Sequence, residues 1–163
     1  MNLNVPFRIG YGIDFHRLEE GRDLWIGGVK LEHHKGAVGH SDADVLLHAI
    51  CDAMLGAACL GDIGIHFPDT DSAYKNIDSK ILLKRSNELI KKAGYRLGNI
   101  DSTVCLELPK IKPYSHEMQM VIAEILEIKE NQVSIKATTS ERMGFVGREE
   151  GIAAYATVLL TSI

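Results

Sequence analysis

The sequence predicts an α+β fold: a two-layer sandwich in which one sheet carries helices on one face, plus a small β-hairpin. Three observations predict it. Strand-like segments stand near both ends of the chain, helical patterns lie between them, and no linker, repeat or charge block divides the 163 residues. A chain of this length can bury a sizeable core without disulfide or metal staples. We therefore expect a single domain, residues 1–163.

The first part of the chain predicts a strand, a hairpin and a helix. Residues 7–15 mix β-branched and aromatic residues with glycines, and residues 24–31 have the pattern of a hairpin. A helix should begin after Ser41, with Asp42 and Asp44 in its first turn. Asp44 stands three residues after Ser41, which nearly matches the sequence pattern of a capping box. Its apolar stripe comprises Leu46, Leu47, Ile50, Met54 and Leu55.

Two further helices are expected. The second should run from Ser79 to Ala93, because Lys91 and Lys92 suit its last turn and Gly94 suits the position that follows. The third has the clearest helical spacing of apolar residues, at Met118, Val121, Ile122, Ile125 and Leu126.

Three more strands are expected, over residues 99–108, 132–139 and 151–162. Because strands come first and last, one sheet should be backed by helices on a single face. The other face would then be bare, and the apolar last strand suits association with further copies of the chain.

Composition excludes several kinds of partner. With a net charge of -4 and a pI of about 6.0, the chain has no global positive field for nucleic acid or an anionic membrane. Its longest apolar runs fall far short of the roughly 20 residues that span a bilayer. The first residues lack the features of a signal or transit peptide, so we expect a cytoplasmic protein. Cys51, Cys59 and Cys105 have apolar neighbours and no C-x-x-C spacing, which predicts reduced core thiols.

A metal site is predicted at Asp14, His16 and His48. Asp14 and His16 are separated by one residue in a predicted strand, so both side chains leave the same face. A carboxylate with two imidazoles and an open fourth position is typical of a reactive zinc site. An isolated aspartate and histidine in a strand are more often structural, hydrogen-bonded residues, but the polar cluster around His48 favours the metal.

That cluster occupies residues 40–48. It contains His40, Ser41 and two aspartates beside His48. Asp44, His48 and Asp52 stack on one side of the predicted helix, so Asp44 or Asp52 should orient the His48 ring. A plainer interpretation is that the aspartates complement the helix dipole, which explains them but not both histidines.

A second polar cluster, residues 61–71, is predicted to be a loop because glycine and proline punctuate it. Asp62 there is a candidate acceptor for substrate hydroxyls. On composition alone, a turn rich in Asx caps explains the segment as well.

A phosphate-binding region is predicted downstream, where no P-loop or G-x-G-x-x-G occurs. Thr138 and Thr139 end a strand in hydroxyls that suit phosphate oxygens, and Glu141 suits a hard cation such as Mg²⁺. The same residues also suit an ordinary turn. Nearby, Phe145 and Arg148 stand between glycines. Residues 109–113 place Lys110, Ile111 and Lys112 between two prolines, a rigid frame for a small flat ligand.

These segments, in this order, resemble the 2-C-methyl-D-erythritol 2,4-cyclodiphosphate synthase family of non-mevalonate isoprenoid synthesis. The matching segments are residues 8–16, 39–44, 61–64 with 67–71, 136–139, and 144–145 with 147–148. They are several, independent and spread over nearly the whole chain.

The resemblance implies a homotrimer whose active sites lie between adjacent subunits, each chain being a single catalytic domain. It implies Zn²⁺ on Asp14, His16 and His48, and Mg²⁺ or Mn²⁺ bridging substrate phosphates near Glu141. Catalytic roles fall to His40, Ser41, Thr138, Thr139 and Glu141. The erythritol phosphate would meet His40, Ser41, Asp62 and Gly64, and the cytidine diphosphate would meet residues 106–112 and 137–139. The full set of implied substrate contacts is Asp14, His16, His40, Ser41, Asp62, Gly64, Phe67, Asp69, Asp71, Leu106, Lys110, Ile111, Lys112, Ala137, Thr138, Thr139, Glu141, Phe145 and Arg148.

The implied reaction starts from 4-diphosphocytidyl-2-C-methyl-D-erythritol 2-phosphate. Its 2-phosphate attacks the β-phosphorus, which expels CMP and closes a cyclic diphosphate. Such a displacement mainly needs positioned phosphates and neutralised charge, and no protein nucleophile. Two alternatives stay open: a zinc-dependent phosphodiesterase or pyrophosphatase using water, and a non-catalytic module that binds cytidine nucleotides or isoprenoid diphosphates.

Overall fold

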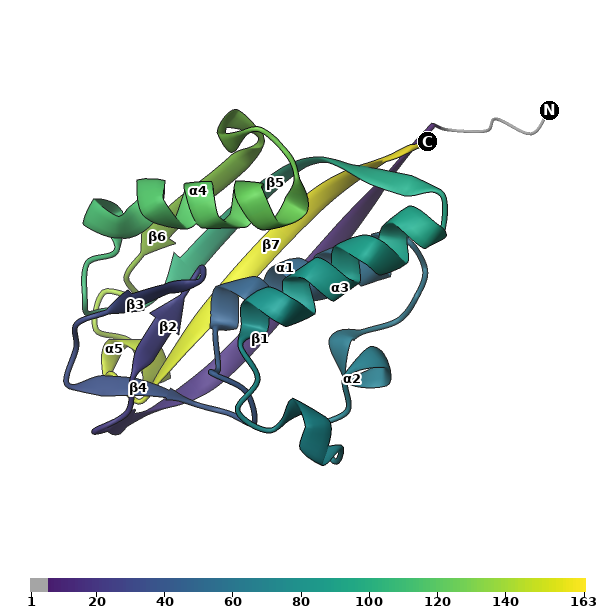
Figure 1. The fold of residues 1–163 in the computed structure, drawn as a ribbon. Coiled ribbons are helices and arrows are strands. Elements are labelled where there is room, and N and C mark those ends of the chain that lie inside the picture. The colour runs from purple at the N-terminus through teal and green to yellow at the C-terminus, as the bar shows by residue number, and fades with distance from the viewer. Residues whose placement is uncertain (1–5) are drawn as a thin grey trace.

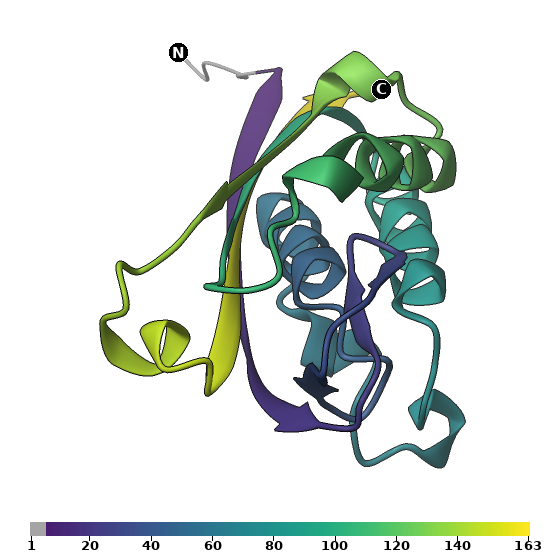
Figure 2. The ribbon, with the colours of Figure 1, turned by 90° about the vertical axis from the view of Figure 1, so that its left-hand side faces the viewer.

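The computed structural model describes residues 6–163 and has two layers, a mixed sheet and a layer of helices (Figures 1 and 2). The sheet has the strand order β4-β1-β7-β5-β6, in which only β5 and β6 pair in parallel. The predicted α+β class is confirmed. The strands are β1 (Phe7–Glu20), β4 (Lys35–Val38), β5 (Tyr95–Cys105), β6 (Val133–Thr138) and β7 (Gly151–Ser162).

Three long helices lie on one face of this sheet, as Figure 2 shows from the side. They are α1 (Val45–Ala57), α3 (Ser79–Lys92) and α4 (Ser115–Leu126). A separate two-stranded antiparallel sheet consists of β2 (Leu24–Ile26) and β3 (Val29–Leu31). The remaining short elements are α2 (Ile63–His66), α5 (Gly144–Gly147), η1 (Ser72–Tyr74), η2 (Lys112–Tyr114) and η3 (Glu130–Gln132).

Several predicted boundaries are wrong. β1 continues to Glu20 because β4, a strand the sequence did not suggest, pairs with its end. α2 interrupts the predicted loop 61–71, since Asp62 caps it by accepting from Ile65 N at 3.0 Å. β5 begins and ends earlier than residues 99–108, and the chain leaves the sheet at Leu106.

The start of α1 also differs from the prediction. The helix begins at Val45, not after Ser41, because Asp44 is its N-cap and accepts from Leu47 N at 3.0 Å. Asp42 therefore lies outside the helix, and no capping box forms at Ser41. α1 is also buried on nearly every side, not along one stripe, since α3 and the sheet both pack against it.

Glycines let α1 lie directly on β1. A Cβ on Gly12 would fall 2.0 Å from the Ala49 carbonyl oxygen, and one on Gly10 would fall 1.9 Å from that of Ala53. No side chain fits there without moving the helix. This close contact brings the middle of α1 over the middle of β1.

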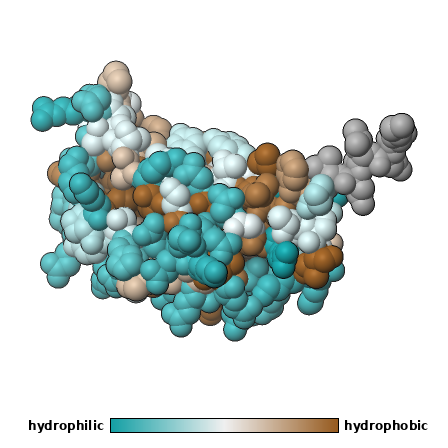
Figure 3. Space-filling view, turned by 90° about the horizontal axis from the view of Figure 1, so that it is seen from above, coloured by the Kyte–Doolittle hydropathy of each residue, from teal (hydrophilic) through white to brown (hydrophobic). Residues whose placement is uncertain are grey.

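The other face of the sheet carries exposed apolar side chains. Ile9, Tyr11, Ile13 and Phe15 alternate along β1 away from the helices and are between 38% and 66% exposed. Figure 3, a view from above, shows mostly hydrophilic side chains over the helices, with brown areas set among paler ones nearer the sheet. Among residues 6–163, no helix is long and apolar enough to cross a membrane.

The prediction that all three cysteines are core thiols is only partly right. Cys51 is buried in α1 and Cys105 is half-buried, but Cys59 is exposed. Cys59 lies in the turn after α1 with a φ of 59°, where the chain leaves the core. All three thiols are free, as predicted.

Candidate functional site

The structure brings Asp14, His16 and His48 together. Asp14 and His16 leave β1 toward the helices, and α1 carries His48 above them. Asp14 Oδ2 lies 2.9 Å from His16 Nδ1 and 3.2 Å from His48 Nδ1. The side chains of Asp14, His16 and His48 are 24%, 11% and 14% exposed, so the group remains open to a ligand on one side.

The charges of this group are strongly coupled. Burial opposes ionisation of Asp14, but hydrogen bonds and positive charge from His16 and His48 outweigh it and lower the pKa of the Asp14 carboxyl to about 2. Burial likewise opposes the charged form of His48, yet the facing Asp14 carboxylate raises the pKa of His48 overall. The group therefore holds an anionic carboxylate ready for a cation.

Two hydroxyls orient the His48 ring. Its Nε2 lies 2.8 Å from Ser79 Oγ and 3.2 Å from Ser41 Oγ. Ser79 Oγ donates to Asp42, so its oxygen is left to accept from His48 Nε2–H. That arrangement keeps Nδ1 facing Asp14 and His16, where it could bind a cation. Ser79 and Asp42 thus take the orienting role, and Ser79 was missed because it is indistinguishable in sequence from an ordinary first helical residue.

The prediction that Asp44 or Asp52 orients His48 is wrong. The fully buried Asp44 carboxylate accepts from Gly27 N at 2.9 Å and from Gly28 N at 2.6 Å, besides capping α1. Asp52 accepts from Ile63 N at 2.7 Å. Asp44 therefore binds the turn at Gly27 and Gly28 to the start of α1, and Asp52 binds the start of α2 to α1. Burial is the main reason that the pKa of each is raised.

The triad suits a zinc-class ion. One ligand atom from each residue lies within 4.8 Å of the others, and the Nδ1 atoms of both rings face the same carboxylate oxygen. His16 Nδ1 is shielded from solvent and lies 2.9 Å from Asp14 Oδ2, so a cation bound there could meet both atoms. Two imidazoles and one carboxylate leave a fourth position open.

A pocket of about 290 Å³ adjoins His48. His40 Nε2 is shielded from solvent and has no hydrogen bond within the described chain, so it is available to a ligand. The predicted contacts Asp62 and Asp71 do not line the pocket, and Asp62 instead caps α2. The pocket is lined by His40, Ser41, His48, Ile63, Gly64, Phe67, Asp69 and Leu82.

The predicted phosphate-binding residues form a separate, exposed turn after β6. Thr139 Oγ1 donates to Glu141 Oε1 at 3.0 Å, and Thr138 Oγ1 donates to the Thr139 carbonyl at 3.1 Å. Glu141 and Arg142 both have positive φ. Glu107 shapes this turn: its Oε1 accepts from Ser140 N at 3.0 Å and from Arg142 N at 3.1 Å. Glu107 was missed because it lies 33 residues before Ser140.

Some of the other predicted ligand contacts are buried, and some are exposed. The side chains of Leu106 and Ile111 are only 4% and 2% exposed and belong to the core. Lys110 and Lys112 are exposed. Phe145 packs edge-on against Phe15 at 5.9 Å.

Arg148 is also engaged within the chain. Its Nε donates to Glu150 Oε1 at 2.9 Å and its Nη2 donates to Glu150 Oε2 at 3.0 Å. These hydrogen bonds, together with the negative charge of Glu150, raise the pKa of the Arg148 guanidinium.

The two predicted halves of the site do not meet in one chain. Asp14 pairs with Ala154, which pairs with Val104, which pairs with Ala137, so three strand spacings, about 14 Å, separate Asp14 from Ala137. Figure 1 likewise shows α2, beside the pocket, and α5, after the Thr139 turn, at opposite sides of the molecule.

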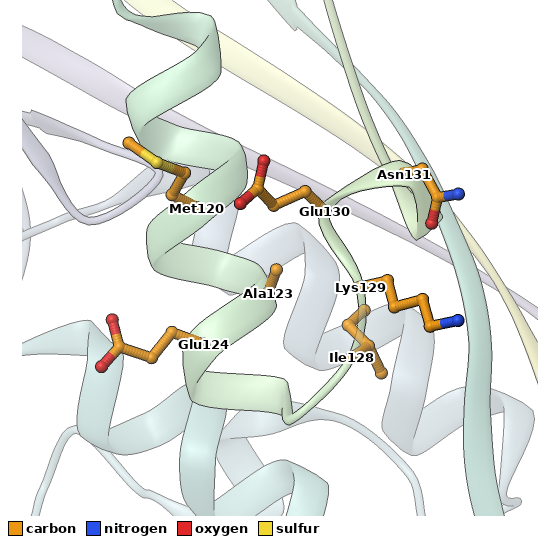
Figure 4. Close-up of a pocket in the computed structure, with 7 residues that line it drawn as sticks. All are labelled: Met120, Ala123, Glu124, Ile128, Lys129, Glu130 and Asn131. Carbon is orange, nitrogen blue, oxygen red and sulfur yellow. The ribbon is translucent and has the colours of Figure 1, made fainter.

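A larger hollow of about 670 Å³ between α4 and η3 lacks such a constellation. Figure 4 shows that the charged side chains of Glu124, Lys129 and Glu130 point in different directions there. The Asp14 group with the His40 pocket is therefore the better candidate site. Together, fold and site define an α+β protein with an open candidate metal site of two histidines and one carboxylate.

Comparisons with known proteins agree with that class and narrow it. The model of the YgbB family matches residues 7–161. A protein of Porphyromonas gingivalis, named 2-C-methyl-D-erythritol 2,4-cyclodiphosphate synthase, is 62% identical over 97% of this chain and 98% of its own length. A Bacteroides fragilis protein of the same name is 61% identical over 98% of this chain and 100% of its own. The chain belongs to the YgbB family, and the predicted resemblance is confirmed.

Solved structures are similar as well. The bifunctional IspDF of Campylobacter jejuni superposes with a TM-score of 0.93 at 43% identity, covering 96% of this chain and 42% of that one. A CDP complex of IspF from Plasmodium falciparum gives a TM-score of 0.83 at 35% identity, covering 96% of both chains.

Proposed function

We propose that this chain converts 4-diphosphocytidyl-2-C-methyl-D-erythritol 2-phosphate into 2-C-methyl-D-erythritol 2,4-cyclodiphosphate and CMP, as a phosphorus–oxygen lyase. The observation that carries this proposal is the convergence of Asp14, His16 and His48 beside a pocket that exposes His40 and Ser41. The chain also belongs to a family whose curated relatives bear the name of that synthase.

Each part of the chain has a distinct task in the proposed reaction. His40 and Ser41 hold the erythritol 2-phosphate, whose oxygen attacks the β-phosphorus. Thr138 and Thr139 hold the diphosphate, and the released CMP takes the electron pair of the broken P–O bond. Positioning and charge neutralisation account for the rate, because nucleophile and leaving group belong to one substrate.

Two cations belong to the proposal. Zn²⁺ on Asp14, His16 and His48 would supply positive charge to the attacking phosphate. Mg²⁺ or Mn²⁺ near Glu141 would balance the diphosphate. Among residues 6–163, Glu141 Oε1 accepts from Thr139 alone and Glu141 is exposed, which leaves the carboxylate open to such an ion.

A homotrimer completes the proposed site. The halves around Asp14 and Thr139 lie apart in one chain, so a neighbouring copy must supply the second half. The exposed apolar face of β1 offers the surface for that contact. Each chain, residues 1–163, would then be a single catalytic domain that shares two active sites.

Incubation with the cytidylylated substrate, Zn²⁺ and Mg²⁺ tests the reaction. CMP and cyclic diphosphate should appear in equal amounts, and neither should contain oxygen from isotope-labelled water. A linear phosphate product carrying solvent oxygen would instead establish a phosphodiesterase or pyrophosphatase.

The variant His48→Ala tests the role of the triad. Loss of one ligand should lower bound zinc and reduce turnover on the order of a thousandfold, equivalent to several kcal/mol of lost charge stabilisation. The exposed His116 on α4 provides the control, since His116→Gln should change neither quantity. Full turnover by a His48→Ala protein that has lost the zinc of the triad would contradict the proposed role.

A further inference from the structure

A second group of potential metal ligands lies away from the Asp14 site. His33, His34 and Glu149 each present one ligand atom, and these atoms lie within 4.8 Å of one another. The two histidines precede β4, whereas Glu149 lies between α5 and β7. Two segments far apart in sequence therefore converge on one point.

Backbone contacts to the end of β1 hold both segments. Gly21 N donates to the His34 carbonyl at 3.0 Å, and Leu18 N donates to the Glu150 carbonyl at 2.9 Å. Because these hydrogen bonds involve only the main chain, they hold the two segments close together without the help of an ion. Such an arrangement lowers the cost of ordering ligands when an ion binds.

One ring nitrogen of this group has no hydrogen-bond partner among the described residues. His33 Nε2 is shielded from solvent and has no hydrogen-bond partner among residues 6–163. The ring packs edge-on against His34, with centroids 4.4 Å apart, and this contact offers no acceptor or donor. A buried polar atom without a partner destabilises the fold, and a bound cation would satisfy it.

We propose that His33, His34 and Glu149 form a second binding site for a zinc-class transition-metal ion. Two imidazoles and one carboxylate are a usual zinc donor set with one position open, and imidazole favours zinc, nickel or copper over magnesium or calcium. His34 is exposed while His33 and Glu149 are half-buried, so an ion can enter from solvent.

The nearby ammonium group of Lys35 does not pair with the Glu149 carboxylate. Lys35 Nζ donates to the main-chain carbonyl of Glu149 at 2.9 Å, and no ion pair joins it to the Glu149 side chain among the described residues. Its positive charge weakens ion binding, but the Glu149 carboxylate stays free to act as a ligand.

The two metal sites are separate. His34 attaches to β1 at Gly21, seven residues beyond Asp14, which is roughly 20 Å along an extended strand. An ion at the second site would cross-link the segment before β4 to the connection between α5 and β7. It would thereby hold α5 and Phe145 against the sheet, independently of the proposed reaction.

Zinc stoichiometry of the full-length protein tests this proposal. After equilibrium dialysis against buffered Zn²⁺, elemental analysis should find about two ions per chain. The double variant His33→Gln/His34→Gln should bind about one, and so should His48→Ala. The exposed His116→Gln is the matched control and should keep both ions.

A second variant keeps the test decisive if the double histidine variant does not fold. Glu149→Gln keeps the size of the side chain but removes its charge, and should weaken one zinc ion at least tenfold while the helical circular dichroism stays unchanged. The proposal is overturned if the unaltered chain binds one ion only, or if these variants retain the full stoichiometry and affinity. Because metal content is measured without substrate, failure here leaves the proposed reaction untouched.

Discussion

The Asp14 group and the Thr139 turn differ in what holds their polar side chains in place. Asp14 and His16 stand on β1 and His48 on the buried helix α1 that packs against it, so the core fixes their positions. Thr139 and Glu141 stand on an exposed turn whose shape depends on local hydrogen bonds and on one carboxylate. The first region is preorganised by packing, whereas the second can adjust to a ligand or a neighbouring copy.

This difference makes the two regions sensitive to different changes. The Asp14 group should suffer from any loss of contact between α1 and β1, even far from a ligand atom. The Thr139 turn should tolerate core changes but respond to the loss of Glu107. Three substitutions separate these dependencies.

Gly12→Ala should have the largest effect. Its Cβ would fall 2.0 Å from the Ala49 carbonyl oxygen and 2.6 Å from Ala53 N, so α1 must move away from β1. We expect a loss of about 3 kcal/mol in the free energy of unfolding, which is roughly 10 °C in melting temperature for a chain of this size. Calorimetry measures the loss, and zinc binding should weaken with it because His48 moves.

Gly56→Ala is the matched control within α1. An added Cβ there meets nothing within 4 Å, and alanine favours a helix over glycine by about 0.5–1 kcal/mol. The control should therefore stabilise the protein slightly. Equal melting temperatures for the two variants would show that close packing of α1 on β1 does not hold the site.

Much of the Asp14 group could be predicted because its spacing is local. The alternation of Asp14 and His16 fixes a shared face, and the apolar residues around His48 fix a buried helix. The helix over 79–93 and the helix that contains Met118 to Leu126 also followed from local periodicity, and the ends of the first differ little from the predicted ones. Such features need only neighbouring residues in sequence.

What could not be predicted depends on contacts between distant segments. Asp44 bonds to the Gly27–Gly28 turn, Ser79 reaches His48 across helices, and Glu107 organises a turn 33 residues later. β4 is a strand only because β1 offers it an edge. In each case the tertiary partner, and not local propensity, decides the role of the residue.

Ser79→Ala should have an intermediate effect, which should be limited to the affinity for zinc. Without this hydroxyl, His48 Nε2 loses its nearer partner at 2.8 Å and keeps only Ser41 Oγ at 3.2 Å, so the ring is held less firmly. Loss of such an outer partner typically weakens a metal 10–100-fold, and we expect zinc affinity to fall by about that factor. Ser86→Ala removes a hydroxyl as deeply buried in the same helix and should leave zinc affinity unchanged. Comparable losses from both variants would assign the effect to α3 as a whole.

Glu107→Ala should have the smallest effect, confined to the Thr139 turn. Hydrogen bonds from Arg142 N and Ser140 lower the pKa of the Glu107 carboxyl below its ordinary 4.5. Their contribution is therefore present above pH 4.5 and is lost as the pH falls through the lowered value.

Without that carboxylate the turn loses its fixed shape, so CMP should bind about fivefold more weakly, a loss of the size of one hydrogen bond. Zinc content should not change, because the Asp14 group rests on the core. Calorimetric titration with CMP measures the first quantity and elemental analysis the second, with the exposed Glu130→Ala as control. A simultaneous loss of zinc would show that the two regions are coupled within one chain, and the contrast between a packed half and an adaptable half would then fail.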